Sequence, residues 1–205
     1  MQAFDQLIGA VTDAVRACTE ELTTLDQAIG DGDHGLNMRR GFDAIAEQRT
    51  ELTSLPAGKA LQKAGMTLVM TVGGASGPLY GSLLMGIGKA LEDELGPPQV
   101  ATALRAGVES VKQRGKSDVG QKTMLDVLVP VLETLEGSDA PAWTPELLDA
   151  LRGAARTGLD STREMRAIKG RASFLGERSV GHLDPGARSS QLLVDTVCTR
   201  IGGAT

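Results

Sequence analysis

Residues 25–37 read LDQAIGDGDHGLN, and this stretch decides how the chain on either side of it folds. Before it, over residues 3–24, apolar residues recur every three or four positions, a spacing that predicts an amphipathic helix. Within it, three glycines and three aspartates interrupt that spacing. After it, the helical spacing resumes over residues 36–53. The stretch is therefore expected to form a tight loop between two helices.

The same periodicity continues along the rest of the chain, while the alternation typical of strands is missing. Aromatic residues make up only 2% of the chain, so the core must be aliphatic, which favours helices over sheets. No internal repeat or domain boundary is visible. We expect an all-α single domain of about eight helices over residues 1–205. Beyond the first two, helices are predicted over residues 56–72, 78–95, 99–113, 123–135, 144–157, 159–167 and 188–201, with residues 169–187 as a long loop.

Charge and cysteine content exclude several classes of protein. The net charge of −5 argues against a nucleic-acid partner, which usually requires a basic face. Cys18 and Cys198 lie in apolar helical patterns and are predicted to be reduced thiols of the core, as in a reducing cytosol. The first ten residues lack the pattern of a signal peptide, and no apolar stretch is long enough to span a bilayer. A cytoplasmic protein without a membrane partner is expected.

Three carboxylates of the loop, Asp26, Asp31 and Asp33, are expected to converge, because its glycines let the backbone turn tightly. Converging anions repel one another unless a cation neutralises them. Carboxylate oxygens without a cysteine cluster suit Mg²⁺, which completes its shell with phosphate oxygens and water. The loop therefore favours a metal beside a phosphate. A solvated acidic turn and a calcium site are the alternatives, although the distal glutamate of an EF-hand loop is missing.

A second loop, GGASGP at residues 73–78, leads directly into a predicted helix. Free N–H groups and the positive dipole end make such a junction a good phosphate site. The loop is not a Walker A sequence, because no Lys-Ser or Lys-Thr follows the glycines. The alternative is an ordinary turn between helices, with Ser76 as its N-cap.

The long loop over residues 169–187 is the third candidate, because loops of this length in compact domains are often functional. It supplies Arg171 and Arg178 for phosphates, and backbone around Asp184-Pro185-Gly186 for a ribose or a purine edge. An ordinary surface loop is the alternative. His34 either donates to a phosphate or acts as an acid or base, or it is a loop histidine in contact with solvent.

Four blocks of the sequence resemble the signature of the DhaL family, the nucleotide-binding subunit or domain of dihydroxyacetone kinases. They follow the family's order and span nearly the whole chain. The blocks are LDQAIGDGDHG at residues 25–35, GGASGPLYG at residues 73–81, KTMLD at residues 122–126, and GRAS, LGERS and GHLDPGA at residues 170–173, 175–179 and 181–187.

The resemblance implies a barrel of eight antiparallel helices, with the nucleotide in the loops at one end. It implies that Asp26, Asp31 and Asp33 hold two Mg²⁺ ions that bridge the phosphates of ADP or ATP. Phosphate contacts are implied for His34, Gly35, Leu36, Asn37, Ala75 and Ser76. Contacts with the rest of the nucleotide are implied for Gly115, Met124, Arg171, Asp184, Pro185 and Gly186.

One position departs from the family pattern. The third block commonly begins with Gly-Asp-Lys, whereas this chain has Gly120-Gln121-Lys122, so an amide replaces a carboxylate. Asp118 lies close by in sequence and is a candidate to compensate. The departure affects helix capping or the polarity of the pocket rather than the metal site.

The expected function is phosphoryl transfer to dihydroxyacetone, or a related short ketose, held by a DhaK-type subunit. The chain would be inactive alone. In one version ADP stays bound and is recharged by a DhaM-type protein of the phosphotransferase system, and a separate short chain favours this version. The alternatives are a split kinase that uses exchangeable ATP, and a nucleotide-charged module that regulates a partner. Assembly as a homodimer is left open.

Overall fold

The computed structural model describes residues 2–92 and 95–203 of the chain. These residues form ten α-helices and one 3-10 helix, with no β-strand, which confirms the all-α prediction. None of the described helices has the length and apolar character needed to cross a membrane. The helices are α1 (Gln2–Ala17), α2 (Thr19–Ile29), α3 (His34–Glu47), α4 (Arg49–Ser54), α5 (Ala57–Thr71), α6 (Ser76–Ala90), α7 (Pro97–Gly115), α8 (Leu125–Glu136), α9 (Pro145–Ser161), η1 (Arg171–Ser179, 3-10) and α10 (Pro185–Gly202).

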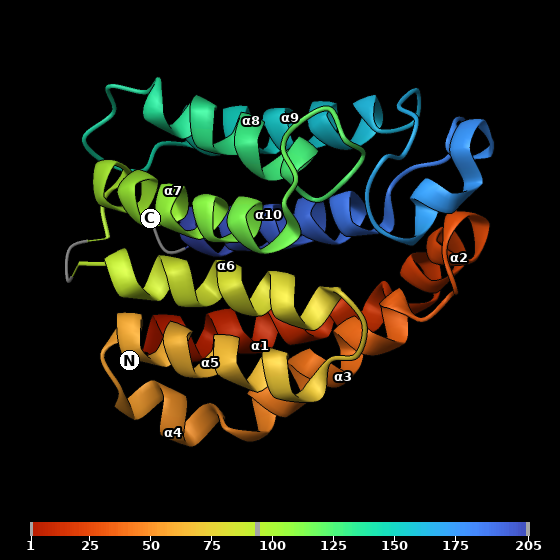
Figure 1. Ribbon diagram of the computed structural model, residues 1–205. Helices are drawn as coiled ribbons and strands as arrows, with labels where there is room; N and C mark the ends of the chain where they lie inside the picture. Colours follow the sequence, from red (N-terminus) through yellow and green to blue (C-terminus); the bar gives the residue numbers. More distant parts are fainter. Residues whose placement is uncertain (1, 93–94, 204–205) are drawn as a thin grey trace.

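Eight of these helices close into a ring. Following their contacts, α1 packs on α3, α3 on α5, α5 on α6, α6 on α7, α7 on α8, α8 on α9, α9 on α10, and α10 returns to α1. The short helix α4 lies outside the ring against α1 and α5, and α2 and η1 lie together at one end (Figure 1). The interior is filled mainly by Leu, Val, Ile, Met and Ala side chains. The structure thus confirms the barrel of eight helices.

Neighbouring helices of the ring run in alternating directions, and this alternation decides the chemistry of its two ends. The N-termini of α3, α6, α8 and α10 all lie at the end of the ring that carries α2 and η1, on the right of Figure 1. Each helix N-terminus carries unpaired N–H groups and about half a positive charge from the helix dipole. This end therefore attracts anions, and the aspartate loop lies there too.

Several predicted helix boundaries were wrong. The first two predicted helices are each divided, at Cys18 and at Gln48, so Asp26 lies in the last turn of a separate helix α2. Residues 162–167 form a turn followed by irregular chain rather than a helix, and residues 171–179 form a 3-10 helix where a structureless loop was expected. The helix predicted over residues 78–95 ends at Ala90, and residues 93–94 lie outside the described part.

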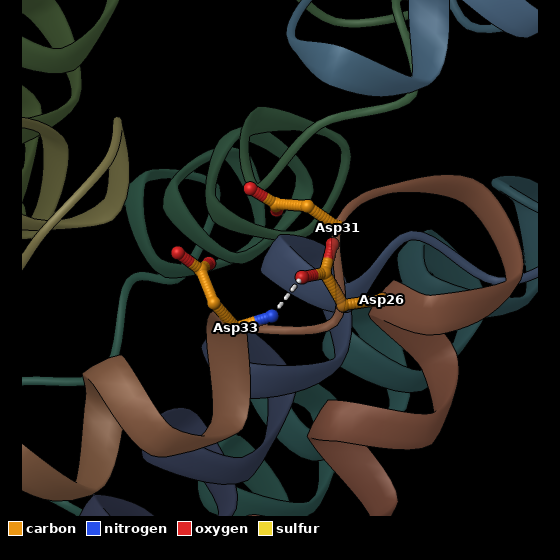
Figure 2. Close-up of side chains that lie close together, drawn as sticks. All are labelled: Asp26, Asp31 and Asp33. Carbon is orange, nitrogen blue, oxygen red and sulfur yellow. Dashed lines mark hydrogen bonds between the residues drawn. The ribbon is translucent and has the colours of Figure 1, made fainter.

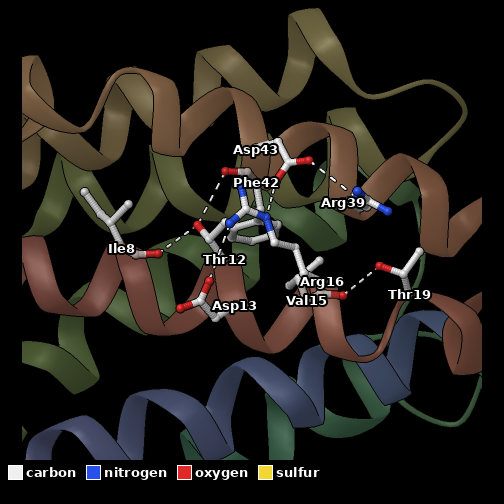
Figure 3. Close-up of polar contacts among 9 residues, drawn as sticks. All are labelled: Ile8, Thr12, Asp13, Val15, Arg16, Thr19, Arg39, Phe42 and Asp43. Carbon is white, nitrogen blue, oxygen red and sulfur yellow. Dashed lines mark hydrogen bonds and ion pairs between the residues drawn. The ribbon is translucent and has the colours of Figure 1, made fainter.

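Polar contacts fix α3 against α1 (Figure 3). The buried hydroxyl of Thr12 donates to the Ile8 carbonyl at 2.8 Å and lies 3.5 Å from the Phe42 carbonyl. Arg16 Nε donates to Asp43 Oδ1 at 2.7 Å. These contacts hold the second half of α3 against α1, the neighbouring helix of the ring.

Candidate functional site: a carboxylate triad among four helix N-termini

The three aspartates converge as the sequence predicts, and Figure 2 shows them around the turn between α2 and α3. One oxygen from each of Asp26, Asp31 and Asp33 lies within 4.8 Å of the others. Asp26 is buried and comes from the last turn of α2, whereas Asp31 and Asp33 are exposed in the loop. A buried carboxylate with two exposed ones beside it leaves the cluster open on the solvent side, where a cation and an anionic ligand can enter.

Asp26 also caps the next helix. Its Oδ2 accepts hydrogen bonds from the backbone N–H groups of Asp33 at 2.9 Å and His34 at 3.1 Å. Those N–H groups lie at the start of α3, where the helix supplies no acceptor of its own. The carboxylate of Asp26 is thus held in one orientation, with Oδ1 left for another partner.

Gly30 is required by this arrangement. A Cβ at this position would lie 2.1 Å from Asp26 Oδ1 and 3.0 Å from the Asp26 carbonyl. Gly32 follows with a φ of +76°, in the left-handed region that favours glycine. A side chain at either position would displace a carboxylate or strain the loop, so the two glycines are part of the site.

The donor set fits a divalent metal of the magnesium type. All three ligands are hard carboxylate oxygens, and no thiol or imidazole nitrogen belongs to the cluster in the described residues. Arg171 of η1 lies beside the cluster, with Nε 2.9 Å from Asp31 Oδ2. A guanidinium therefore already pairs with one carboxylate of the triad, as expected where three anions meet.

A cavity of about 330 Å³ extends from the triad across the ring end. The helix starts of α3, α6, α8 and α10 all contribute to its wall, through His34, Ser76, Met124 and Pro185. The structure thus brings together most of the residues assigned from sequence. These lining residues are Asp26, Asp31, Asp33, His34, Ala75, Ser76, Gly115, Met124, Arg171, Asp184, Pro185 and Gly186.

Four assigned residues do not line this cavity: Gly35, Leu36, Asn37 and Arg178. Gly35 packs against α2, where an added Cβ would lie 2.1 Å from the Thr19 carbonyl. Leu36 and Arg178 are exposed, and Asn37 is buried with Oδ1 accepting from Arg40 at 3.3 Å. Their nucleotide contacts stay predictions.

His34 is not a solvent-exposed loop residue. It is 6% exposed, with Nδ1 3.0 Å from Ser76 Oγ and Nε2 2.8 Å from Ser189 Oγ. Burial lowers the pKa of the ring, against the opposing charges of Asp26 and Asp33. Sequence reasoning missed Ser189 and its partner Tyr80, whose pKa burial raises to about 12. Adjacent serines on the inner side of an amphipathic helix were the available signal.

Lys122 joins three segments beneath the cavity. It is 1% exposed, and Nζ donates to the carbonyls of Thr162 and His182, each at 2.5 Å. Its backbone φ of +59° is unusual for a residue with a side chain. Burial lowers the pKa of its ammonium, against the charge of Asp184. A buried cation in a strained backbone fixes the start of α8 against the end of α9 and the loop before α10.

Asp184 caps α10, accepting from the Ala187 N–H at 2.7 Å, and burial raises the pKa of its carboxyl to about 7.

Gln121 is the position where the chain departs from the family pattern, and its Oε1 is buried without a hydrogen-bond partner. Asp118 does not compensate, because it pairs with Lys112 at 2.8 Å. The capping role belongs instead to Asp126, which accepts from the N–H groups of Gly120 and Thr123 at 2.5 and 2.7 Å.

The fold and the site together define a class: an all-helical domain that presents a carboxylate triad and four helix N-termini to one pocket. Comparison with known proteins identifies the family. A family model described as the DAK2 domain matches residues 28–199. The ADP-binding subunit DhaL of PEP-dependent dihydroxyacetone kinase 1 from Listeria innocua is 46% identical over 173 residues, covering 84% of this chain and 82% of the relative. The corresponding Escherichia coli subunit is 44% identical over 179 residues, covering 86% and 85%.

A solved structure agrees with the sequence comparisons. The dihydroxyacetone kinase from C. freundii in complex with AMP-PNP and Mg²⁺ superposes with a TM-score of 0.74 at 25% identity. The match covers 95% of this chain and 33% of that one. The chain belongs to the DhaL family.

Proposed function

We propose that this chain is the ADP-binding subunit of a dihydroxyacetone kinase and that it holds the nucleotide through Mg²⁺. The observation that carries the proposal is the convergence of three carboxylates within 4.8 Å beside a pocket walled by four helix N-termini. The carboxylates can hold a metal, and the helix N-termini can hold phosphates. The pocket therefore suits a metal-bound polyphosphate better than a metal or an anion alone. The names of the relatives support the same assignment.

The division of roles follows from where each residue lies. Asp26, Asp31 and Asp33 would hold Mg²⁺, which when bound offsets phosphate charge. Ala75 and Ser76, at the start of α6, would turn backbone N–H groups toward the phosphates. Arg171, 2.9 Å from Asp31, lies within reach of the same phosphates. Gly115, Met124 and residues 184–186 line the rest of the cavity and would surround the ribose and base.

A protein partner is proposed because apolar side chains gather around the site. Five of the seven exposed large hydrophobic residues in the described chain belong to segments at the pocket end of the ring. Their concentration at this end of the ring suits a protein interaction surface. We call these five the apolar rim and propose that a DhaK-type subunit carrying the ketose docks there. The rim consists of Leu36, Met70, Val119, Ile168 and Phe174.

Phe174→Glu tests this docking surface. Phe174 is 88% exposed and does not line the cavity. We expect turnover with the partner subunit to fall at least about tenfold, because hot-spot aromatics carry much of an interface's binding energy. ADP affinity should not change. The matched control is Leu95→Glu, which charges an exposed apolar residue outside the rim and should leave both quantities as in the wild type. If the two substitutions lowered turnover equally, the apolar rim would not be the docking surface.

Reconstitution decides between the donor versions. The chain is mixed with a DhaK-type subunit and dihydroxyacetone, and is supplied either with ATP alone or with phosphoenolpyruvate and the phosphotransferase proteins, including a DhaM-type protein. We propose that transfer occurs only in the second mixture, with ADP retained as a cofactor, in the cytoplasm. Transfer with ATP alone would support the split ATP-dependent kinase. If no transfer occurred in either mixture, the kinase function would be contradicted, and the nucleotide-charged regulatory module would remain as the alternative.

A further inference from the structure

A buried hydrogen-bond network ties together three of the helix N-termini that wall the pocket. His34 begins α3, Ser76 begins α6, and Ser189 lies one turn into α10. The imidazole of His34 bridges the other two, 3.0 Å from Ser76 Oγ through Nδ1 and 2.8 Å from Ser189 Oγ through Nε2. The hydroxyl of Tyr80, from the second turn of α6, lies 2.7 Å from Ser189 Oγ and closes the network. The positions of the three helix starts are therefore linked through Ser189.

Burying this network is costly unless every polar group in it is satisfied. Ser189 is fully buried, and Ser190 and Tyr80 are 1% and 3% exposed. A hydroxyl removed from water without a partner costs on the order of 1–3 kcal/mol in proteins. These hydroxyls lie where an amphipathic helix ordinarily places aliphatic side chains. The Ser190 hydroxyl lies 2.8 Å from that of Tyr80. Two adjacent buried serines are thus explained by their partners and not by packing.

The directions of the hydrogen bonds follow from two groups that can only accept. Ser189 Oγ lies 3.0 Å from the Pro185 carbonyl and 3.1 Å from the Gly186 carbonyl, so its single proton points toward these oxygens. With its proton placed on the carbonyls, Ser189 offers His34 Nε2 a lone pair, and the proton between them is assigned to Nε2. A neutral imidazole has one N–H, so Nδ1 is left as an acceptor and the Ser76 hydroxyl donates to it.

We propose that Ser189 is a positioning residue for the nucleotide phosphates: it holds His34 as the Nε2–H tautomer, so that His34 accepts the Ser76 hydroxyl. The inference rests on the proposed function, because it concerns how the same pocket binds its phosphates. The hydroxyl of Ser76 is committed to His34, which leaves backbone N–H groups of the first turn of α6 to meet the ligand. Tyr80 supports Ser189 from α6, with its own hydroxyl 3.0 Å from the Gly186 carbonyl.

The test compares Ser189→Ala with Thr12→Ala. Thr12 is a matched control, because it also has a buried hydroxyl bonded to a backbone carbonyl, but it lies between α1 and α3 and does not line the pocket (Figure 3). Two quantities are measured for each variant: the ADP dissociation constant in Mg²⁺ by calorimetry, and the nitrogen-15 NMR signals of the imidazoles. The chain has only two histidines, and His182 is exposed, so the signals of His34 can be assigned.

We expect the wild type to show the Nε2–H tautomer at His34. Ser189→Ala should give a mixture of tautomers and bind ADP about tenfold more weakly, as expected when a buried donor loses its acceptor. Thr12→Ala should lower thermal stability with ADP affinity within about twofold of the wild type. The Nδ1–H tautomer in the wild type, or unchanged ADP affinity in Ser189→Ala, would overturn the proposal.

Tyr80→Phe keeps the test decisive if Ser189→Ala does not fold. This variant removes one partner of Ser189 and retains the bond to His34, so the tautomer should persist while ADP affinity falls about threefold. Unchanged affinity would again count against the positioning role. The NMR measurement needs no nucleotide, so a wild type that bound no ADP would contradict the proposed function and still leave the tautomer at His34 to be determined.

Discussion

Asp31→Asn is expected to weaken ADP binding in Mg²⁺ by on the order of 100-fold or more, because it replaces one of three charged carboxylate ligands with a neutral amide. The fold should persist. Asp31 is exposed, and its contact with Arg171 is a surface ion pair, a kind worth little to stability. Removing the charge of Asp31 also relieves its repulsion with Asp26 and Asp33, which offsets the small loss of stability from the broken ion pair. Titration calorimetry with ADP, with and without Mg²⁺, measures the effect.

Asp43→Asn is the matched control for Asp31→Asn. Its side chain is 32% exposed, against 36% for Asp31, and it too pairs with an arginine, Arg16, at 2.7 Å (Figure 3). The same isosteric loss of one charge should leave ADP affinity unchanged there. An Asp31→Asn protein that bound ADP and Mg²⁺ as the wild type does would mean that the triad is an acidic turn and not a metal site.

Gly35→Ala is expected to lower the free energy of unfolding by about 3 kcal/mol and to impair ADP binding with it. The added Cβ would lie 2.1 Å from the Thr19 carbonyl and 2.8 Å from the Thr23 backbone nitrogen, so rigid backbone atoms of α2 must move. Since α3 would shift away from α2, the N–H groups of Asp33 and His34 would lose Asp26 as their acceptor. Urea unfolding of the metal-free protein gives the first effect, and ADP titration the second.

Gly153→Ala provides the contrast. This glycine lies in the exposed part of α9, and nothing lies within 4 Å of the Cβ that alanine would add. Alanine should therefore stabilise the protein by about 0.5–1 kcal/mol through its better helix propensity, without an effect on ADP. If both substitutions stabilised the protein equally, the close contact of α2 with α3 would be refuted.

Local chemistry in the sequence was sufficient for the helices and for much of the pocket. The spacing of apolar residues predicted the ring helices, because each one turns a single stripe toward a shared core. The glycines at 30 and 32 predicted a tight loop, because glycine lets the backbone turn where other residues would clash or be strained. Arg171 and Met124, which the resemblance assigned to the nucleotide site, line the cavity.

What the sequence did not predict depends on side chains that meet only after the chain has folded. The contact of His34 with Ser189 joins residues 155 positions apart, and no periodicity marks it. Lys122 adopts a positive φ that its residue type does not suggest. Arg178 and Arg171 lie in one segment, but the 3-10 helix turns only Arg171 into the pocket wall. Such pairings depend on tertiary structure, and a local sequence pattern does not predict them.

Native mass spectrometry of the purified protein tests the central claim most directly. The chain is incubated with ADP and Mg²⁺, desalted, and weighed intact, with Asp31→Asn treated in parallel. We predict a wild-type mass equal to the chain plus one ADP and two Mg²⁺, and a bare chain for Asp31→Asn. A wild-type protein that stayed bare, or that retained ADP equally well after the metal had been chelated, would contradict a nucleotide held through magnesium by Asp26, Asp31 and Asp33.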